Sequence, residues 1–545
     1  MPKITIDGQT CEFEGKKTIL QVANDNGIEI PQYCYHEGLS IVASCRICLA
    51  EVAQPNPRKD NALELIPKLV PTCQTPAVDG AEVYLKSPKT IANQKSVMEF
   101  LLINHPLDCP VCDQAGECHL QDYSYNYGRA ESRFEETKIK QPKKDIGPNV
   151  LLYSDRCIMC SRCVRFTREI TGTNEIGIFG RGSSEQIDVF PGKPLDNELS
   201  GNVVDICPVG ALLDKDFLMS MRVWNLTKTP SIDGVTASGD NISIEHNQGR
   251  IYRVKPRTNI DVNKWWISDE IRYGWRFVHD EERLKAPALN KEGNAASTDW
   301  HTATNEVARQ LKDLVKYKGD GSLGLLVSPM LASEEAFLLA QWALKIDPGA
   351  VIAIGPVPFV GEDKHFPGGY TVRAEKAPNA RGVRRALEKI AQTVLDHDEF
   401  LDLLDTEDSG ITGLIITGNT PSPRHDDRLV AAARDRYTLL IDTLPSPLIE
   451  VADVVLPAAT WAEKDGCFEN VNGRIQSFER AIEPLEGTRP EGQIAHDLMA
   501  AASLAPATQY NAVRTREQIA GEFVESIHTP VYFDNRETDL QYVTL

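Results

Sequence analysis

The first 85 residues carry a pattern of apolar and polar positions that predicts strands around a short helix. Residues 3–13 alternate in character around Asp7-Gly8, a dipeptide typical of a hairpin turn. Apolar residues then recur at helical spacing over 18–26, and Gly27 is placed to end that helix. Strand, turn, strand and helix, followed by a cysteine-rich loop, predict a small β-grasp domain over 1–85.

A helical pattern follows the first domain. It runs over 87–122 and is broken at His105-Pro106, where the proline interrupts helix geometry. The predicted apolar stripe has four members: Val97, Phe100, Leu101 and Leu102. Residues 131–149 contain several Lys, Glu and Pro residues and indicate a linker or an exposed connection. We therefore predict a helical domain over 86–125 and a third domain over 126–225.

The chain changes character after residue 226. Alternating segments within 226–283 predict a small β domain, and βα alternation over 284–507 predicts an open α/β domain with a largely parallel sheet. Its predicted strands include 323–327, 414–417 and 439–442, with a helix starting at Ser333. Residues 508–545 are polar and weakly patterned, which indicates a C-terminal arm. The fold class is thus multidomain, α+β and then α/β.

Composition narrows the class of protein. A chain of 545 residues exceeds what one hydrophobic core supports. The formal charge of −20 argues against a nucleic-acid partner, because phosphate binding needs concentrated Lys and Arg. No window approaches the roughly 20 consecutive apolar residues of a membrane span, and the N-terminus lacks a basic region followed by an apolar stretch. We expect the protein to stay in the compartment where it is made.

The cysteines point to metal or redox chemistry. Twelve of the thirteen precede residue 208, and Cys467 stands alone. A disulfide framework is typical of small secreted domains, whereas close pairs and triplets in a long chain without a secretion signal indicate metal binding. Cys11 and Cys467 lack partners at ligand spacing and are expected to be buried apolar residues.

A first set contains Cys34, Cys45, Cys48 and Cys73, spaced C-x10-C-x2-C-x24-C. Four thiolates can surround the two irons of a [2Fe–2S] cluster, one loop supplying three and a distant strand the fourth. Zinc binding and unliganded thiols remain alternatives on spacing alone. The predicted β-grasp domain around the set favours the [2Fe–2S] cluster.

A second set contains His105, Cys109, Cys112 and Cys118, spaced H-x3-C-x2-C-x5-C. Taken alone, three cysteines and one histidine favour structural zinc. The position of the set between two iron–sulfur candidates favours instead a [4Fe–4S] cluster with one histidine ligand, which shifts its reduction potential.

A third set contains Cys157, Cys160 and Cys163, followed by Cys207-Pro208. Ferredoxins combine such a C-x2-C-x2-C triplet with a Cys-Pro pair, and here each occurs once, which predicts one [4Fe–4S] cluster rather than zinc. The glycine-rich run 177–182 invites a phosphate-loop interpretation, but a turn packed near this cluster is favoured.

Three predicted clusters within about 210 residues describe an electron conduit. The sequence has no flavin or nicotinamide fingerprint and no evident nucleophile or acid–base pair, so we predict no catalytic residue and no cofactor ligand beyond the cluster ligands. Such a chain requires an electron donor and an acceptor elsewhere.

The cysteine sets lie within motifs that resemble a known family, the large, G-type iron–sulfur subunit of respiratory complex I, the NADH:quinone oxidoreductase. The motifs that carry the resemblance are 31–36 (PQYCYH), 44–48 (SCRIC), 105–113 (HPLDCPVCD), 116–118 (GEC), 156–166 and 204–212 (VDICPVGAL). They cover the first 215 residues.

The remainder resembles the molybdopterin oxidoreductase fold. The resemblance rests on 266–269 (WISD), 452–457 (ADVVLP), 463–467 (EKDGC) and 472–474 (NGR). Catalytic members are longer, and many relatives hold a further [4Fe–4S] cluster in the small domain, where 231–236 has no thiol here. The resemblance implies a degenerate α/β domain over 284–507, with no fourth cluster and no molybdenum.

The family resemblance implies a place in a larger assembly. Electrons would arrive from a flavin subunit that oxidises NADH, with its [2Fe–2S] companion, and leave through a two-cluster ferredoxin-like subunit towards the quinone module, supporting proton pumping by the whole complex. The location implied is peripheral, on the cytoplasmic side of a bacterial inner membrane or the matrix side in an organelle. Alternatives are the catalytic subunit of a NAD-linked formate dehydrogenase, a diaphorase subunit of a NAD-reducing hydrogenase, and a zinc scaffold.

Overall fold

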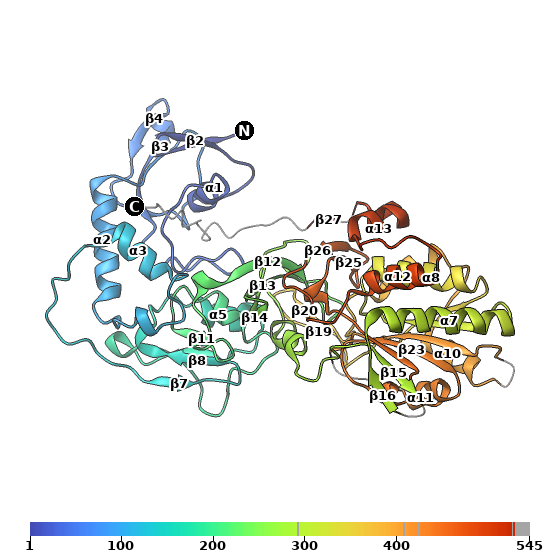
Figure 1. Cartoon of the computed structure of the whole chain (residues 1–545). Coiled ribbons are helices and arrows are strands. Elements are labelled where there is room, and N and C mark those ends of the chain that lie inside the picture. Colours follow the sequence, from blue (N-terminus) through green and yellow to red (C-terminus); the bar gives the residue numbers. More distant parts are fainter. Residues whose placement is uncertain (292–293, 407–408, 422–425, 526, 529–545) are drawn as a thin grey trace, which may run out of the picture. The chain divides into compact units, whose positions relative to one another are not determined.

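The computed structural model describes residues 1–545 except 292–293, 407–408, 422–425, 526 and 529–545. The chain forms two compact units (Figure 1). Unit 1 contains Met1–Leu226 and Phe366–Tyr370; unit 2 contains Thr227–His365 and the described residues from Thr371 onwards. Within the described ranges, no helix combines the length and apolar character that crossing a membrane requires.

Unit 1 begins with a mixed sheet in the strand order β2-β1-β6-β3-β4, with β5 beside β3. Its strands are β1 (Lys3–Ile6), β2 (Gln9–Glu12), β3 (Leu49–Asn56), β4 (Ala62–Leu65), β5 (Val70–Pro71) and β6 (Glu82–Tyr84). The predicted hairpin is confirmed, since β1 and β2 pair antiparallel and Asp7 and Gly8 both have positive φ, 45° and 86°. Helix α1 (Ile19–Asp25) starts at a Thr18 capping box and buries its apolar side chains in the domain core.

Helix α2 (Pro88–Leu102) is capped by Ser87, and α3 (His119–Tyr127) follows the second cysteine group. The predicted stripe is wrong at Phe100, whose side chain is 70% exposed. The buried face of α2 is formed by Thr90, Gln94 and Met98. Two of these have polar partners, since the Thr90 hydroxyl donates to the Tyr84 carbonyl and the Met98 sulfur accepts from Tyr33 Oη. The spacing of apolar residues therefore could not predict which face of α2 is buried, because that face is fixed by these contacts.

The rest of unit 1 holds two small antiparallel sheets, in the orders β11-β8-β7 and β10-β9. Their strands are β7 (Lys143–Asp145), β8 (Val150–Tyr153), β9 (Ile176–Phe179), β10 (Gln186–Val189) and β11 (Leu212–Asp214). The linker or exposed connection predicted over 131–149 includes β7, which pairs with β8 and has two exposed residues of three. The glycine-rich run 177–182 lies partly in β9 and then turns at Gly180, where φ is 78°. The short helix α4 (Arg162–Arg165) contains Cys163, and α5 (Asn202–Asp205) ends just before Cys207.

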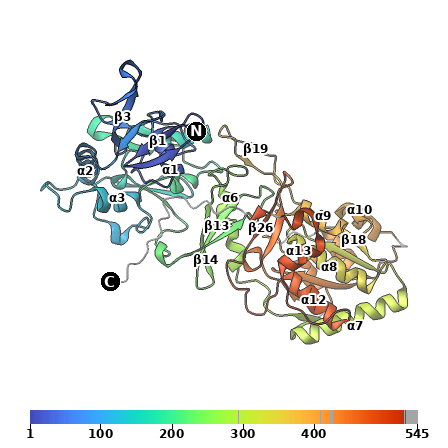
Figure 2. The same ribbon diagram turned by 90° about the horizontal axis from the view of Figure 1, so that it is seen from above.

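Unit 2 opens with the antiparallel sheet β12-β13-β14, formed by β12 (Thr227–Ile232), β13 (Asn241–Asn247) and β14 (Arg250–Pro256). This sheet lies within 226–283, where the sequence predicts β structure, and it is part of unit 2. Asn241 Nδ2 on β13 donates to Gln476 Oε1 on β26 (Ile475–Phe478) at 2.8 Å, so the two strands lie close together (Figure 2). Strand β26 pairs with β25 (Gly466–Glu469) and β27 (Ile527–His528), and α6 (Asp269–Tyr273) packs on β14.

The centre of unit 2 is an eight-stranded sheet in the order β16-β15-β24-β23-β22-β17-β18-β21, six strands of which run parallel. The strands are β15 (Ala288–Lys291), β16 (Asn294–Ser297), β17 (Leu323–Val327), β18 (Val351–Ile354), β21 (Val394–Leu395), β22 (Gly413–Thr417), β23 (Tyr437–Asp442) and β24 (Val454–Pro457). A separate hairpin joins β19 (Lys364–His365) and β20 (Thr371–Val372). The largely parallel sheet is as predicted.

Helices cover both faces of this sheet (Figure 1). One face packs against α7 (Trp300–Lys318), α8 (Ser333–Ile346), α9 (Ala380–Glu388), α12 (Glu491–Ala501) and α13 (Ala512–Ile519); the other packs against α10 (His397–Leu404) and α11 (Asp427–Arg434). The predicted C-terminal arm contains α13, whose Ile519 is buried in the core, and the rest of it from 529 lies outside the described residues.

A charged network is buried in unit 2. Lys464 Nζ lies 2.8 Å from Glu335 Oε2 and 2.6 Å from Glu491 Oε2, and all three side chains are at most 1% exposed. Desolvation is the largest influence on Glu335 and raises its pKa, whereas the Lys464 ammonium opposes that rise. The two carboxylates therefore depend on one ammonium group for their charge balance.

Candidate metal centres

The first cysteine set lies on the loop between α1 and β3 and just after β5. The sulfur atoms of Cys34 and Cys45 are 3.4 Å apart, and Cys48 and Cys73 are both buried in the core of the same domain, where Cys73 is the largest influence on the pKa of Cys48. The neighbouring thiol, Cys45 for Cys34 and Cys73 for Cys48, lowers the pKa of Cys34 to about 5 and that of Cys48 to about 7. The set is thus arranged as two pairs, each with one thiol that readily becomes a thiolate.

This pairing fits a binuclear centre, in which each of two irons takes two thiolates. A single zinc ion would draw all four sulfurs to one point at about 2.3 Å from the metal. The loop also holds Ala43 and Arg46 in the left-handed region, with φ of 50° and 60°.

The second set lines one cavity, to which His105, Cys109, Cys112 and Cys118 all contribute. Burial is the largest influence on His105 and lowers its pKa to about 4, with smaller contributions from Lys138 and Arg156. At neutral pH its imidazole is therefore uncharged and has a lone pair for a metal. Burial also raises the pKa of Cys118 to about 12, so its thiolate needs a positive partner such as iron.

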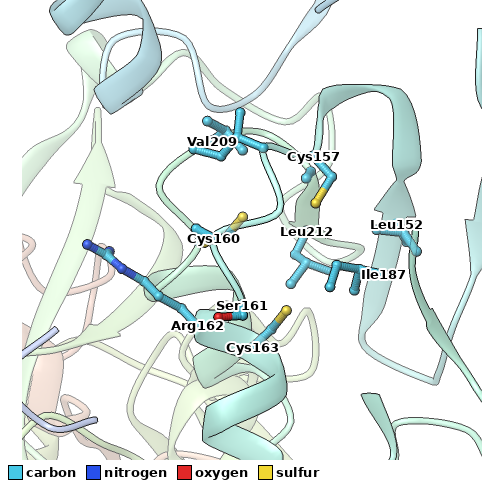
Figure 3. Close-up of a pocket in the computed structure, with 12 residues that line it drawn as sticks. Leu152, Cys157, Cys160, Ser161, Arg162, Cys163, Ile187, Val209 and Leu212 are labelled. Carbon is cyan, nitrogen blue, oxygen red and sulfur yellow. The ribbon is translucent and has the colours of Figure 1, made fainter. Parts of the chain in front are cut away.

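The third set lines a second cavity, formed by Cys157, Cys160, Cys163 and Cys207 with apolar neighbours that include Leu152 and Ile187. Figure 3 shows the labelled cysteine sulfurs directed into this space, with Arg162 extending away from it. Desolvation raises the pKa of Cys157 to about 12 and that of Cys207 to about 11. The cavity is therefore lined with sulfur and apolar side chains, which suits an iron–sulfur cluster.

The backbone of the third set is shaped for its cysteines. Met159 and Ser161, which separate the three cysteines of the triplet, adopt φ of 53° and 60°. The amide of Met159 donates to Cys157 Sγ at 3.4 Å. Such turns direct amide groups towards negative charge. The structure thus brings together each set that the sequence predicted, and it keeps Cys11 and Cys467 elsewhere, both fully buried.

Two buried arginines join the first and third sets, a role that the sequence analysis did not assign. Arg165 donates to the carbonyl oxygens of Cys34 and Ser40, and to that of Cys160 at 3.4 Å. Arg162 donates to Tyr35 O at 2.5 Å and to Ile206 O at 3.1 Å. The available signal was the presence of these two arginines within and directly after the cysteine triplet.

Five protein-family descriptions match separate parts of the chain. They are 2Fe-2S iron-sulfur cluster binding domain (2–88), NADH-ubiquinone oxidoreductase-G iron-sulfur binding region (94–133), NADH-quinone oxidoreductase subunit 3, ferredoxin-like domain (147–213), NADH-ubiquinone oxidoreductase NDSU1/NuoG-like, 4Fe-4S domain (226–276) and molybdopterin oxidoreductase (388–501). Residues 226–276 contain no cysteine, although the description matched there names a cluster.

Curated relatives match more of the chain. The NADH-ubiquinone oxidoreductase 75 kDa subunit of Reclinomonas americana is 41% identical over 58% of this chain and 44% of its own length. The chain aligns with 41% to 48% of the length of several such relatives. A solved NAD+-reducing [NiFe]-hydrogenase chain is 26% identical with a TM-score of 0.35, covering 41% of this chain and 91% of that chain, a likeness too low to carry an argument.

One relative aligns over nearly the whole molecule. The mitochondrial NADH dehydrogenase [ubiquinone] iron-sulfur protein 1 of Solanum tuberosum is 30% identical over 94% of this chain and 82% of its own length. The fold predicted from the sequence, with ferredoxin-like domains followed by a molybdopterin-oxidoreductase-like region, agrees with these matches. The chain belongs to the family of large, G-type iron–sulfur subunits of NADH:quinone oxidoreductase, respiratory complex I.

Proposed function

We propose that this chain is the electron-relay subunit of an NADH:quinone oxidoreductase, with one [2Fe–2S] and two [4Fe–4S] clusters in unit 1. The observation that carries the proposal is that each of the three cysteine sets comes together in the fold, one as two thiol pairs and two around separate cavities. Bound clusters would supply one-electron acceptance and donation at each site. The chain's own residues hold the ligands, exclude water and fix the separations.

The ligands proposed are those of the three sets. The first is Cys34, Cys45, Cys48 and Cys73, the second His105, Cys109, Cys112 and Cys118, and the third Cys157, Cys160, Cys163 and Cys207. Arg165 donates to the backbone of a cysteine in the first set and of one in the third. This contact supports a short path between those two centres.

The proposal extends to partners and location. Electrons enter from a flavin subunit that oxidises NADH, with its [2Fe–2S] companion, and leave to a two-cluster ferredoxin-like subunit of the quinone module. The chain associates with the membrane through that complex, on the cytoplasmic or matrix side. We propose no fourth cluster, because 226–276 offers no thiol, and no molybdenum in unit 2.

Metal analysis of the anaerobically purified full chain, with low-temperature EPR after dithionite reduction, tests the proposal. We expect about ten irons per chain from one binuclear and two tetranuclear clusters. Stoichiometric molybdenum would favour a dehydrogenase of the formate type, and zinc in place of iron would overturn the electron relay.

Single substitutions assign the irons to the sets. Cys48→Ala is expected to remove about two irons, and Cys112→Ala and Cys160→Ala about four each. Cys11→Ala is the matched control, because this thiol lies in the same unit, is fully buried and belongs to none of the sets. Equal loss of iron in Cys11→Ala and Cys48→Ala would contradict the assignment.

A further inference from the structure

Arg156 lies against the second cavity, beside the ligands of the second set. It is 3% exposed, so its guanidinium is surrounded by protein. A guanidinium does not lose its proton in a protein, so burial leaves a fixed positive charge at this position.

The contacts of Arg156 hold the side chain in place. Nε and Nη2 both donate to Oδ2 of Asp108, at 3.2 and 3.0 Å. The guanidinium carbon lies 3.9 Å from the ring centroid of Tyr153, a cation–π contact. Nη1 is buried and has no hydrogen-bond partner among the described residues. A buried donor without a partner is unfavourable, which calls for an acceptor that binds at this place.

The second cavity contains the acceptor sulfurs that this donor lacks. Gly210 lines the same cavity, and a Cβ built on it would lie 2.3 Å from Cys112 Sγ and 3.9 Å from Arg156 Cδ. The next residue after Arg156, Cys157, lines the third-set cavity, as does Val209 before Gly210. Arg156 therefore lies in the wall that separates the two cavities, with its side chain on the second.

We infer that Arg156 is a positioning residue that raises the reduction potential of the cluster held by the second set, and that Nη1 donates to the sulfur of that centre. The inference rests on the proposed function. Reduction adds one electron and no proton to the site, so it makes the centre more negative by one charge. A fixed positive charge in a poorly screened interior favours that state. Asp108 opposes the effect, because its carboxylate partly neutralises the guanidinium.

EPR-monitored redox titration of the full, cluster-loaded chain tests this, with the second-set signal identified as the one altered by His105→Cys. Arg156→Met is expected to decrease the equilibrium constant for one-electron reduction of the second-set cluster about tenfold. This corresponds to a midpoint potential lower by about 59 mV. Arg156→Lys keeps the charge and should shift it less. Asp108→Asn keeps an oxygen acceptor for Arg156 and should shift the potential upwards.

Arg156→Met and Asp108→Asn are expected to shift the midpoint potential in opposite directions, which distinguishes an electrostatic effect from general damage to the site. Arg133→Met is the matched control, because Arg133 also pairs with a carboxylate, Glu99, but its side chain is 65% exposed. In this variant the midpoint potential of the second-set cluster should equal that of the wild type. If Arg156→Met fails to load iron, Asp108→Asn decides: an upward shift supports the inference, and no shift or a downward shift overturns it. Absence of the cluster from the wild type would instead refute the proposed function.

Discussion

Replacing Gly210 with alanine should remove the cluster of the second set while leaving the other two. Gly210 does not adopt a positive φ, so alanine is compatible with its backbone. Its new Cβ would, however, lie 2.3 Å from Cys112 Sγ. Non-bonded contacts of this kind need about 3.5 Å or more, so the sulfur must move by about 1.2 Å. Functional groups are held to within about 0.5 Å of productive geometry, so this displacement exceeds what a ligand tolerates.

The free-energy change expected for Gly210→Ala is also unfavourable. Overpacking costs about 1–3 kcal/mol, whereas the entropy gained by replacing glycine with alanine returns only about 0.4–1 kcal/mol. The assay is iron content with EPR of the reduced protein, and we expect a loss of about four irons and of one [4Fe–4S] signal. Gly177→Ala is the control, because its nearest neighbour is the partly exposed ring of Phe179, which can move. Wild-type iron and an unchanged second-set signal in Gly210→Ala would refute the reasoning.

Three further substitutions probe other contacts. Arg165→Met should lower the urea midpoint of unfolding and the iron content of the first set, because each hydrogen bond from a charged donor contributes about 1.5–3 kcal/mol. Arg168→Met, at a largely exposed side chain, should change neither. Equal effects of the two substitutions would contradict the view that Arg165 joins the first and third sets. Lys464→Met leaves two buried carboxylates without their cation and should destabilise unit 2 by about 3–5 kcal/mol in denaturant unfolding, so an unchanged midpoint would show that the network is dispensable. Cys467→Ala should keep all of the iron, and measured iron loss would mean that a ligand was missed.

Local patterns in the sequence predicted the parts of the fold that depend on local chemistry. Asp7-Gly8 specified a hairpin turn, and Thr18 and Gly27 bounded a helix, because these residues act within a few positions of themselves. The buried face of α2 was not predictable in this way. Thr90 is buried there because its hydroxyl meets the Tyr84 carbonyl, and Phe100 is exposed because that face meets no part of the described core. Such choices depend on tertiary partners.

The same distinction between local and tertiary information applies to the candidate sites. Cysteine spacing specified which thiols belong together, since a cluster fixes the chemistry of its ligands. Spacing could not reveal that Arg156 lies against the second cavity or that Arg165 joins the first and third sets, because these contacts bring distant segments together. The pairing of Cys34 with Cys45 and of Cys48 with Cys73 likewise needed coordinates.

The left-handed residues of the two cysteine loops have a consequence for how the protein is made. Ala43, Arg46, Met159 and Ser161 each hold a backbone conformation that costs about 1–2 kcal/mol for a residue with a side chain. Folded domains are stable by only about 5–15 kcal/mol, so four such residues take a large share. Bound clusters would offset part of that cost, which would couple the folding of unit 1 to iron delivery. A cell short of iron should therefore lose this protein by proteolysis of the unloaded chain, and its abundance should follow the iron supply after synthesis of the polypeptide.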